Sequence, residues 1–261
     1  MHSWDADQYL RFANERIQPA LDLVARIELP VPRPLQKLRI VDLGCGPGNS
    51  TAILKARWPE AEITGLDNDA DMLATARRDH PGIEFAGADI AQWPPDLQYD
   101  LVFSNAALQW VGDHERLLPR LFDAVAAGGA LAVQMPHNHD FQTHALMRQV
   151  AAEGPWAERL ADARAPSPVK PPEFYYDCLA PRSARFTIWE TNYIQIMDGA
   201  EAIVSWLMGT GLRPFLARLT VEEQPVFLDR YQALLADAFP PRADGKVMLP
   251  YPRLFFIASR R

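Results

Sequence analysis

The most distinct hydrophobic pattern in the chain is a short apolar run that ends in a glycine-rich turn. Residues 40–43 (Ile-Val-Asp-Leu) are mostly apolar without alternation, which is typical of a strand buried on both faces. Gly44, Gly46 and Gly48 follow, and residues 52–58 then have the spacing of a helix. Glycine permits positive φ and lets a ligand approach the backbone, and the N-terminus of the following helix presents unpaired N–H groups. The pattern therefore predicts a strand, a tight ligand-binding turn and a helix.

An apolar strand with a polar residue at or near its end recurs three times after this unit. The expected strands are 62–67, 83–90 and 99–105, and the polar residues are Asp67, Asp89 and Asn105. Stretches with helical spacing separate the strands, as in a parallel sheet. Because ligands of open parallel sheets bind outside the carboxyl ends of the strands, these polar residues and the glycine turn predict one binding site.

The remaining pattern is less regular. Residues 4–26 predict an amphipathic helix that is interrupted at Pro19, and a proline-rich linker follows at 30–34. The other expected helices are 144–164, 200–208 and 220–239, the last with a capping box of Thr220 and Glu223, and the other expected strands are 130–136, 186–197 and 254–258.

Composition narrows the class of partner. The chain has 261 residues and a net charge of −7, so it lacks the basic excess that binding to nucleic acid requires. No apolar run is long enough to span a membrane and the first residues show no signal-peptide pattern, so we expect a cytoplasmic protein with no membrane contact. Its two cysteines form no C-x-x-C motif. His137, His139 and His144 have no convincing further ligand at metal-binding spacing, so no metal is expected.

The residues from Asp42 to Gly48, Asp-Leu-Gly-Cys-Gly-Pro-Gly, are similar to motif I of the class I S-adenosylmethionine (SAM) methyltransferases. The alternative is a dinucleotide site with a variant turn, since the G-x-G-x-x-G fingerprint places its third glycine one position later. The resemblance implies an α/β, Rossmann-like fold. In it a mostly parallel seven-stranded sheet has helices on both faces and a helical insertion near the C-terminus. It divides the chain into a lid helix (1–34), a SAM-binding core (35–197), a helical cover (198–250) and a returning strand (251–261).

The resemblance also implies roles for residues around the expected SAM site. Arg16 would meet the SAM carboxylate, Asp67 would bond both ribose hydroxyls, and Asp89 and Ile90 would bind adenine. This role of Asp67 is compatible with Asn68 and Asp69 acting as helix caps, because these two residues precede a helical run from Met72 to Arg78. The expected cofactor-binding residues are Arg16, Asp42, Gly44, Cys45, Gly46, Asn49, Asp67, Asn68, Met72, Asp89, Ile90, Asn105, Ala106 and Trp110.

Residues 134–136, 208–214 and 249–255 resemble carboxyl methyltransferases of this family that act on a small tricarboxylate. One departure is His137, where the family has an acidic residue. An ionised carboxylate needs no general base, so the enzyme has chiefly to align its substrates and no certain catalytic residue is expected.

Arginine forks suit carboxylates, which makes Arg213 and Arg253 candidates for binding the spectator carboxylates. Asn138 and Tyr251 are further substrate-binding candidates, and Tyr9, Trp110 and Tyr251 are candidates for orienting the reacting group. The alternatives are a carboxyl methyltransferase for another acid, such as a malonyl thioester, and a SAM-binding regulator without catalysis. We expect a monomer.

Overall fold

The computed structural model describes residues 13–29, 37–94, 97–164 and 169–261. One seven-stranded sheet runs in the order β3-β2-β1-β4-β5-β7-β6. Its strands are β1 (Arg39–Leu43), β2 (Glu62–Asp67), β3 (Glu84–Gly87), β4 (Tyr99–Asn105), β5 (Val125–Pro136), β6 (Arg185–Met197) and β7 (Val247–Ser259). The pairs from β3 through β5 are parallel, and β7 lies antiparallel to β5. This sheet confirms the expected Rossmann-like fold.

The described chain divides into two units, and β6 and β7 contribute residues to both. The first, here called the sheet unit, comprises the described residues up to 136 together with 169–191 and 253–261. The second, here called the helical unit, comprises 137–164 and 192–252. The cover expected at 198–250 lies in the helical unit, which also includes residues after the fifth strand.

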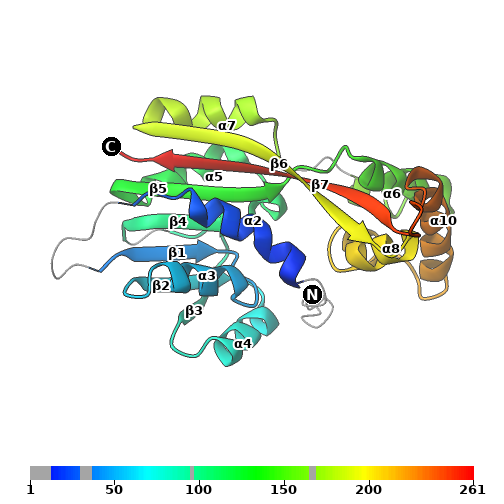
Figure 1. Cartoon of the computed structure of the whole chain (residues 1–261), viewed down its shortest axis with the longest axis horizontal. Helices are drawn as coiled ribbons and strands as arrows, with labels where there is room; N and C mark the ends of the chain where they lie inside the picture. Colours follow the sequence, from blue (N-terminus) through cyan, green and yellow to red (C-terminus); the bar gives the residue numbers. More distant parts are fainter. Residues whose placement is uncertain (1–12, 30–36, 95–96, 165–168) are drawn as a thin grey trace. The chain divides into compact units, whose positions relative to one another are not determined.

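Helices cover both faces of the sheet unit because its central strands are apolar on both sides. On one face, α5 (His114–Asp123) and α7 (Pro172–Leu179) bury Leu118, Leu121 and Tyr175 in a core with Val102 and Leu131. On the opposite face lie α2 (Ala13–Ala25) and α3 (Asn49–Arg57), which are in front of the strands in Figure 1. The expected strand over residues 40–43 is confirmed as fully buried. A further helix of the unit, α4 (Ala70–Asp79), follows β2.

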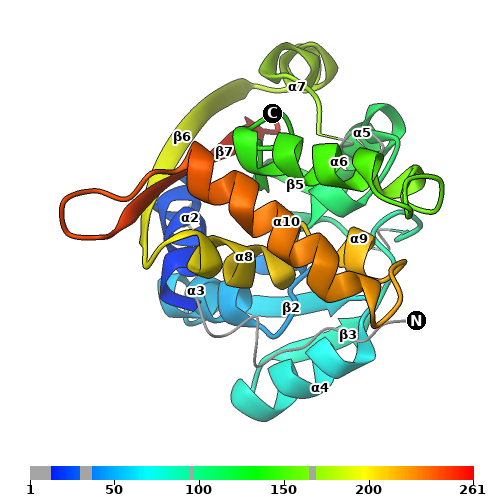
Figure 2. The ribbon, with the colours of Figure 1, turned by 90° about the vertical axis from the view of Figure 1, so that its right-hand side faces the viewer.

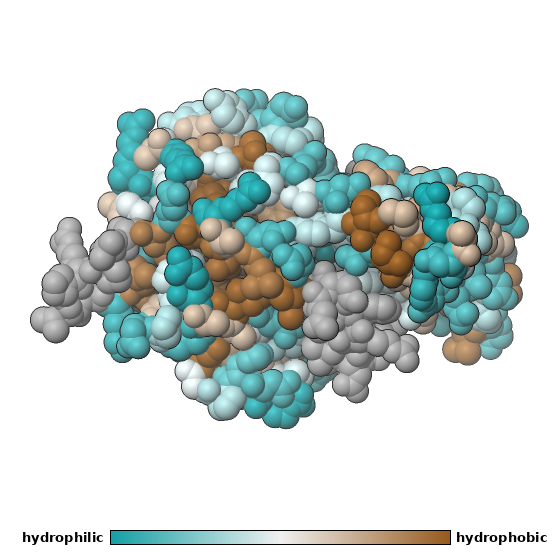
Figure 3. Space-filling view, in the orientation of Figure 1, coloured by the Kyte–Doolittle hydropathy of each residue, from teal (hydrophilic) through white to brown (hydrophobic). Residues whose placement is uncertain are grey.

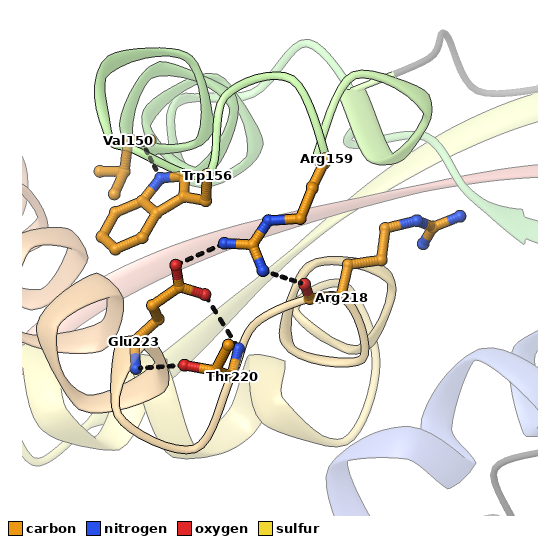
Figure 4. A network of polar contacts seen from close by, with 6 residues as sticks. All are labelled: Val150, Trp156, Arg159, Arg218, Thr220 and Glu223. Atoms are coloured by element: carbon orange, nitrogen blue, oxygen red, sulfur yellow. Dashed lines mark hydrogen bonds and ion pairs between the residues drawn. The ribbon is translucent and has the colours of Figure 1, made fainter.

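The helical unit has its own apolar core, formed mainly by aromatic and aliphatic side chains of four helices. Figure 2 labels these four helices. These helices are α6 (Gln142–Glu153), α8 (Ala200–Met208), α9 (Arg213–Leu216) and α10 (Glu223–Ala238). The start of α10 is held by the expected capping box, in which the Thr220 N–H donates to Glu223 Oε2 (2.9 Å) and the Glu223 N–H to Thr220 Oγ1 (3.3 Å). Arg159 joins this network through an ion pair with Glu223, and nearby the Trp156 indole donates to the Val150 carbonyl (Figure 4).

Two of the expected helices differ from the structure. The interruption at Pro19 is wrong: α2 runs through Pro19, which is buried, and the burial of Leu23 and Val24 on the same helix holds it together despite one missing hydrogen bond. The helix expected over 144–164 is also wrong in its extent. Here α6 ends at Glu153, because Gly154 and Pro155 follow and end the hydrogen-bonded turns.

The other differences concern the starts of two strands, two helices and three short turns. Strand β7 begins at Val247, well before the expected start at residue 254, and β5 begins at Val125. Helices α5 and α7 were not predicted. In α5 the internal Pro119 obscures the helical pattern, whereas α7 begins at Pro172, in a proline-rich stretch that was expected to be a loop. The remaining elements are the 3-10 turns η1 (Leu108–Trp110), η2 (Asp162–Arg164) and η3 (Ala180–Arg182).

The visible surface is mostly hydrophilic, with apolar residues gathered over α2 in the sheet unit (Figure 3). In the helical unit, Ile194 and Ile196 of β6 are exposed together with Met248 of β7. Among the described helices, none has the length and apolar character needed to cross a bilayer.

Candidate functional site

The glycine turn after β1 has the backbone conformation that the sequence predicts. Gly44, Gly46 and Gly48 all have positive φ, at 72°, 53° and 91°. The Gly44 N–H donates to the Leu66 carbonyl at 2.7 Å, which ties the turn to the end of β2. A Cβ on Gly44 would lie 2.2 Å from Ala107 Cβ, so only glycine fits there.

Gly46 provides an open cradle in the same turn. A Cβ built on this residue would meet nothing within 4 Å, in contrast to Gly44. Its N–H donates to Asp67 Oδ2 at 2.8 Å, so the side chain that ends β2 fixes the turn. The other oxygen, Oδ1, accepts from the Asp69 N–H at 2.9 Å. A carboxylate has about four lone-pair sites, so two backbone bonds leave acceptor capacity for a ligand.

Asp42 is a completely buried carboxyl group beneath this turn. Its Oδ2 accepts hydrogen bonds from the hydroxyls of Ser50 and Thr51 in α3, both at 2.7 Å. Burial raises the pKa of Asp42 to about 6, although the two hydroxyl bonds oppose this rise. Its Oδ1 makes no hydrogen bond to any described residue. A buried acceptor without a partner is costly, and a cationic or hydrogen-bonding ligand group would satisfy it.

The cradle at Gly46 and the unsatisfied oxygen of Asp42 therefore fit the methionine end of SAM, whose ammonium group is a donor. Further residues expected at this site lie around the same strand ends. Asn49 begins α3, and Asn68 follows Asp67 directly. The Asp69 side chain caps α4 by accepting from the N–H groups of Asp71 and Met72, both at 3.0 Å. The expectation that Asp69 caps this helix is confirmed.

The side chains of Cys45 and Met72, both expected at the cofactor, are buried. Burial raises the pKa of the Cys45 thiol, and a Cβ on Gly65 would lie 3.0 Å from its Sγ. Cys45 packs with Leu73, Ala76 and Phe85 in a small apolar cluster. The Cys45 N–H donates to the Leu66 carbonyl at 2.9 Å, and its thiol donates to the Gly46 carbonyl at 3.6 Å.

The loop after β3 holds the two residues expected at adenine. Asp89 lies beyond the strand, which ends at Gly87, and its Oδ1 accepts from the Ala91 N–H at 2.9 Å. Ile90 is buried, and its Cδ1 would lie 3.4 Å from a Cβ on Gly44. Arg120 of α5 donates to the carbonyls of Ile90 and Ala91, at 2.8 and 2.7 Å. Sequence reasoning missed Arg120 because α5 itself was not predicted.

The turn after β4 contains Asn105, Ala106 and Trp110. Asn105 Oδ1 is buried and makes no hydrogen bond within the described part of the chain. Ala106 has φ +54°, which is uncommon for a residue other than glycine. The Trp110 side chain is 52% exposed. Ala107 brings this turn into contact with Gly44, so the cofactor residues after β1, β3 and β4 form one group in the sheet unit.

The expected substrate residues are divided between the two units. Asn138, Arg213 and Tyr251 belong to the helical unit, where the Tyr251 ring meets Trp206 edge-on with centroids 5.6 Å apart. Asn138 and Tyr251 are buried, and Arg213 begins α9. Arg253 belongs to the sheet unit, is 5% exposed and is paired with Pro136 across β5 and β7. Tyr9 and the side chain of Arg16 lie outside the described residues.

Burial favours the neutral form of two histidines of the helical unit, His139 and His144. Burial lowers the pKa of His144 to about 4, and it lowers the pKa of His139 as well. The two rings lie with centroids 6.4 Å apart. Across the residues that the structure describes, no three His, Cys, Asp or Glu side chains are grouped so as to hold a metal ion.

Comparisons with known sequences are consistent with this geometry. A model of the methyltransferase domain family matches residues 40–129, which include the glycine turn and the strand ends described above. The trans-aconitate 2-methyltransferase of Azoarcus sp. is 48% identical to this chain over 260 residues, covering 100% of both proteins. That of Methylobacterium nodulans is 52% identical over 261 residues, covering 100% of this chain and 99% of the relative.

Solved structures show the same fold at low sequence identity. The YcgJ protein of Bacillus subtilis is 13% identical with a TM-score of 0.58, over 94% of this chain and 99% of that one. The phosphoethanolamine N-methyltransferase 2 of Haemonchus contortus, solved with SAM, is 16% identical with a TM-score of 0.52, over 94% of this chain and 53% of that one. The sheet order and these likenesses identify the fold of class I SAM methyltransferases.

Proposed function

This chain belongs to the trans-aconitate 2-methyltransferase family, and we propose that it forms a monomethyl ester of trans-aconitate. The chain is a SAM-dependent methyltransferase, which removes the dinucleotide alternative. The structural observation that supports cofactor binding is the open glycine turn at Gly46, four residues after the buried Asp42, whose Oδ1 has no hydrogen-bond partner among the described residues. When bound there, SAM supplies an electrophilic methyl group.

The residues of the sheet unit bind and orient the cofactor in this proposal. Asp67 would accept the ribose hydroxyls while its bonds to Gly46 and Asp69 keep the carboxylate in place. Asp42 would accept from the ammonium group through Oδ1, since Oδ2 is already engaged by α3. Asp89 and Ile90 would face adenine. The N-terminal segment 1–34, with Arg16 on the SAM carboxylate, would act as a lid, and 198–250 as a cover.

The arginines are proposed to bind the substrate rather than to activate it. An arginine on the reacting carboxylate would withdraw its negative charge and weaken the nucleophile. Arg213 and Arg253 are therefore assigned to the two spectator carboxylates, which their forks match in geometry. The reacting carboxylate would be oriented by neutral donors, namely the side chains of Asn105, Trp110, Asn138, Tyr251 and Tyr9. No proton has to be removed, because a carboxyl group with a pKa near about 4 is ionised at neutral pH.

The direct test is mass analysis of the products after incubation of the protein with SAM and trans-aconitate. We expect a monomethyl ester and a rate that is nearly flat between about pH 6 and 8, because the nucleophile is already ionised. Formation of no ester from trans-aconitate, but of one from another acid, would overturn the substrate assignment. A basic limb near about pH 7 would instead indicate a general base, contrary to the proposal.

Arg213→Ala and Arg253→Ala should each raise the KM for trans-aconitate by at least about tenfold, the scale of a lost charged hydrogen bond. The affinity for S-adenosylhomocysteine (SAH) should change little. Lysine at either position should restore the KM only in part, because its point charge cannot form the paired bonds of the guanidinium group. Equal losses of acid and SAH affinity would show that these arginines support cofactor binding instead.

A further inference from the structure

The turn after β4 contains a strained residue at the cofactor-binding edge of the sheet unit. Ala106 has φ +54°, in the left-handed region. This conformation is unfavourable for an L-residue with a Cβ. Such a residue persists only where the surroundings hold it in place. Contacts with neighbouring residues must therefore hold the backbone of Ala106 in this conformation.

Two hydrogen bonds hold Ala106 from opposite sides of its backbone. Its N–H donates to the Gln134 carbonyl of β5 at 2.9 Å. Its carbonyl accepts from Gln109 Nε2 at 2.6 Å. Gln109 is half-buried and lies in η1, the short 3-10 turn that follows Ala106. A side chain three residues further along the chain therefore closes the turn.

The turn at residues 105–107 packs against the glycine turn after β1. Ala107, the next residue, is the one whose Cβ leaves no room for a side chain at Gly44. Asn105, the preceding residue, has a buried Oδ1 with no hydrogen bond to the described chain. A backbone shift at Ala106 would therefore displace both of its neighbours: Ala107, which packs against Gly44, and Asn105, whose side-chain oxygen has no partner among the described residues.

We propose that Gln109 is a positioning residue for methyl transfer. By donating to the Ala106 carbonyl it holds the strained Asn105–Ala107 turn against the Gly44 loop, and it acts on the cofactor only through that turn. The inference rests on the proposed placement of SAM at the glycine turn. It requires a donor at position 109, because the group that Gln109 contacts is a carbonyl oxygen.

The test is a double-mutant cycle between positions 109 and 106, with SAH affinity measured by calorimetry. Gln109→Met keeps the length of the side chain but removes the donor, and SAH affinity should fall about tenfold, as for one lost hydrogen bond with its acceptor left unpaired. Ala106→Gly removes the strain itself, because glycine adopts positive φ without strain, and its SAH affinity is the reference for the double variant. The double variant should recover most of the loss, since the strain that Gln109 opposes is gone.

Gln224→Met is the matched control. The Gln224 Nε2 donates to the Leu216 carbonyl at 3.1 Å, so the control removes the same kind of bond in the helical unit. It should lower the melting temperature to a similar extent without changing SAH affinity. In activity assays at saturating substrates, Gln109→Met should also lower kcat, and Ala106→Gly should restore it.

The measured SAH affinity, kcat and melting temperature distinguish a positioning role of Gln109 from a purely structural one. Unchanged SAH affinity and kcat in Gln109→Met would overturn the proposal, and so would a double variant that stays as impaired as Gln109→Met. A fall in melting temperature alone would reveal a purely structural bond and would also overturn it. Wild-type protein that fails to bind SAH would instead refute the placement of the cofactor, which separates the two failures.

Discussion

Replacing Asp67 with alanine tests the cofactor site at the residue where most of its parts converge. The carboxylate accepts from the N–H groups of Gly46 and Asp69, and it is proposed to accept from the ribose as well. Hydrogen bonds to a charged group contribute about 1.5–3 kcal/mol, so losing the ribose contacts should weaken SAH binding by about 10- to 150-fold. Stability should also fall, by about 1 kcal/mol, because two backbone donors lose a half-exposed acceptor to which water has access.

The assay combines calorimetric titration with SAH and thermal unfolding of the same samples. Asp69→Ala is the control, because Asp69 caps α4 and its loss should lower stability by about 1 kcal/mol without removing a ribose contact. The reasoning predicts similar melting temperatures for the two variants but a large difference in SAH affinity. If Asp67→Ala binds SAH as tightly as wild type at a temperature where it is folded, the ribose assignment is refuted.

Two other predictions follow from the buried side of the turn. Because burial raises the pKa of Asp42 from 3.8 to about 6, the folded state holds the proton more tightly, and stability should fall by roughly 3 kcal/mol as pH rises from about 4 to 6. Comparison of urea unfolding between wild type and Asp42→Asn isolates this slope, and equal slopes would show that Asp42 does not titrate in this range. Gly44→Ala should lower stability by about 2 kcal/mol or more, through positive φ and the 2.2 Å approach to Ala107. Gly46→Ala, which meets no neighbour, should lose less stability on thermal unfolding, and equal losses would mean that the contact with Ala107 relaxes without strain.

The parts of the fold that could be predicted are those with strong local signals. The buried run at 40–43 and the alternating glycines determine the strand and turn through sterics alone, and the Thr220–Glu223 box marks the start of α10 closely. Proline led to wrong predictions where tertiary packing overrides local preference. Pro19 does not interrupt α2, and α5 was not predicted because it contains Pro119. Burial of the apolar face of α5 compensates for its proline, and no local pattern reports that burial.

The sequence predicts those site residues that lie at the ends of strands. It does not predict residues that support the site through contacts with other residues. Asp67 and Gly46 meet because β1 and β2 are adjacent and parallel, which the order of elements implies. The role of Arg120 depends on a side chain that reaches from α5 to carbonyls of the loop after β3. The strain at Ala106 depends on a backbone angle. The sequence does not indicate that Arg120 reaches this loop. It does not indicate the strain at Ala106 either, because glycine rather than alanine is the residue that normally marks a positive φ.

The environment of the two cysteines has a practical consequence for chemical labelling. Oxidants and alkylating reagents attack the thiolate form, so reactivity requires access and a low pKa. Cys45 is 3% exposed and burial raises its pKa, so the residue inside the glycine turn is protected from both kinds of reagent. Burial raises the pKa of Cys178 in α7 as well, but this residue is only partly buried, so it is the more accessible of the two thiols. A maleimide dye applied to the folded protein would therefore attach at Cys178, which gives a native attachment point for spectroscopic probes that leaves the glycine turn chemically intact.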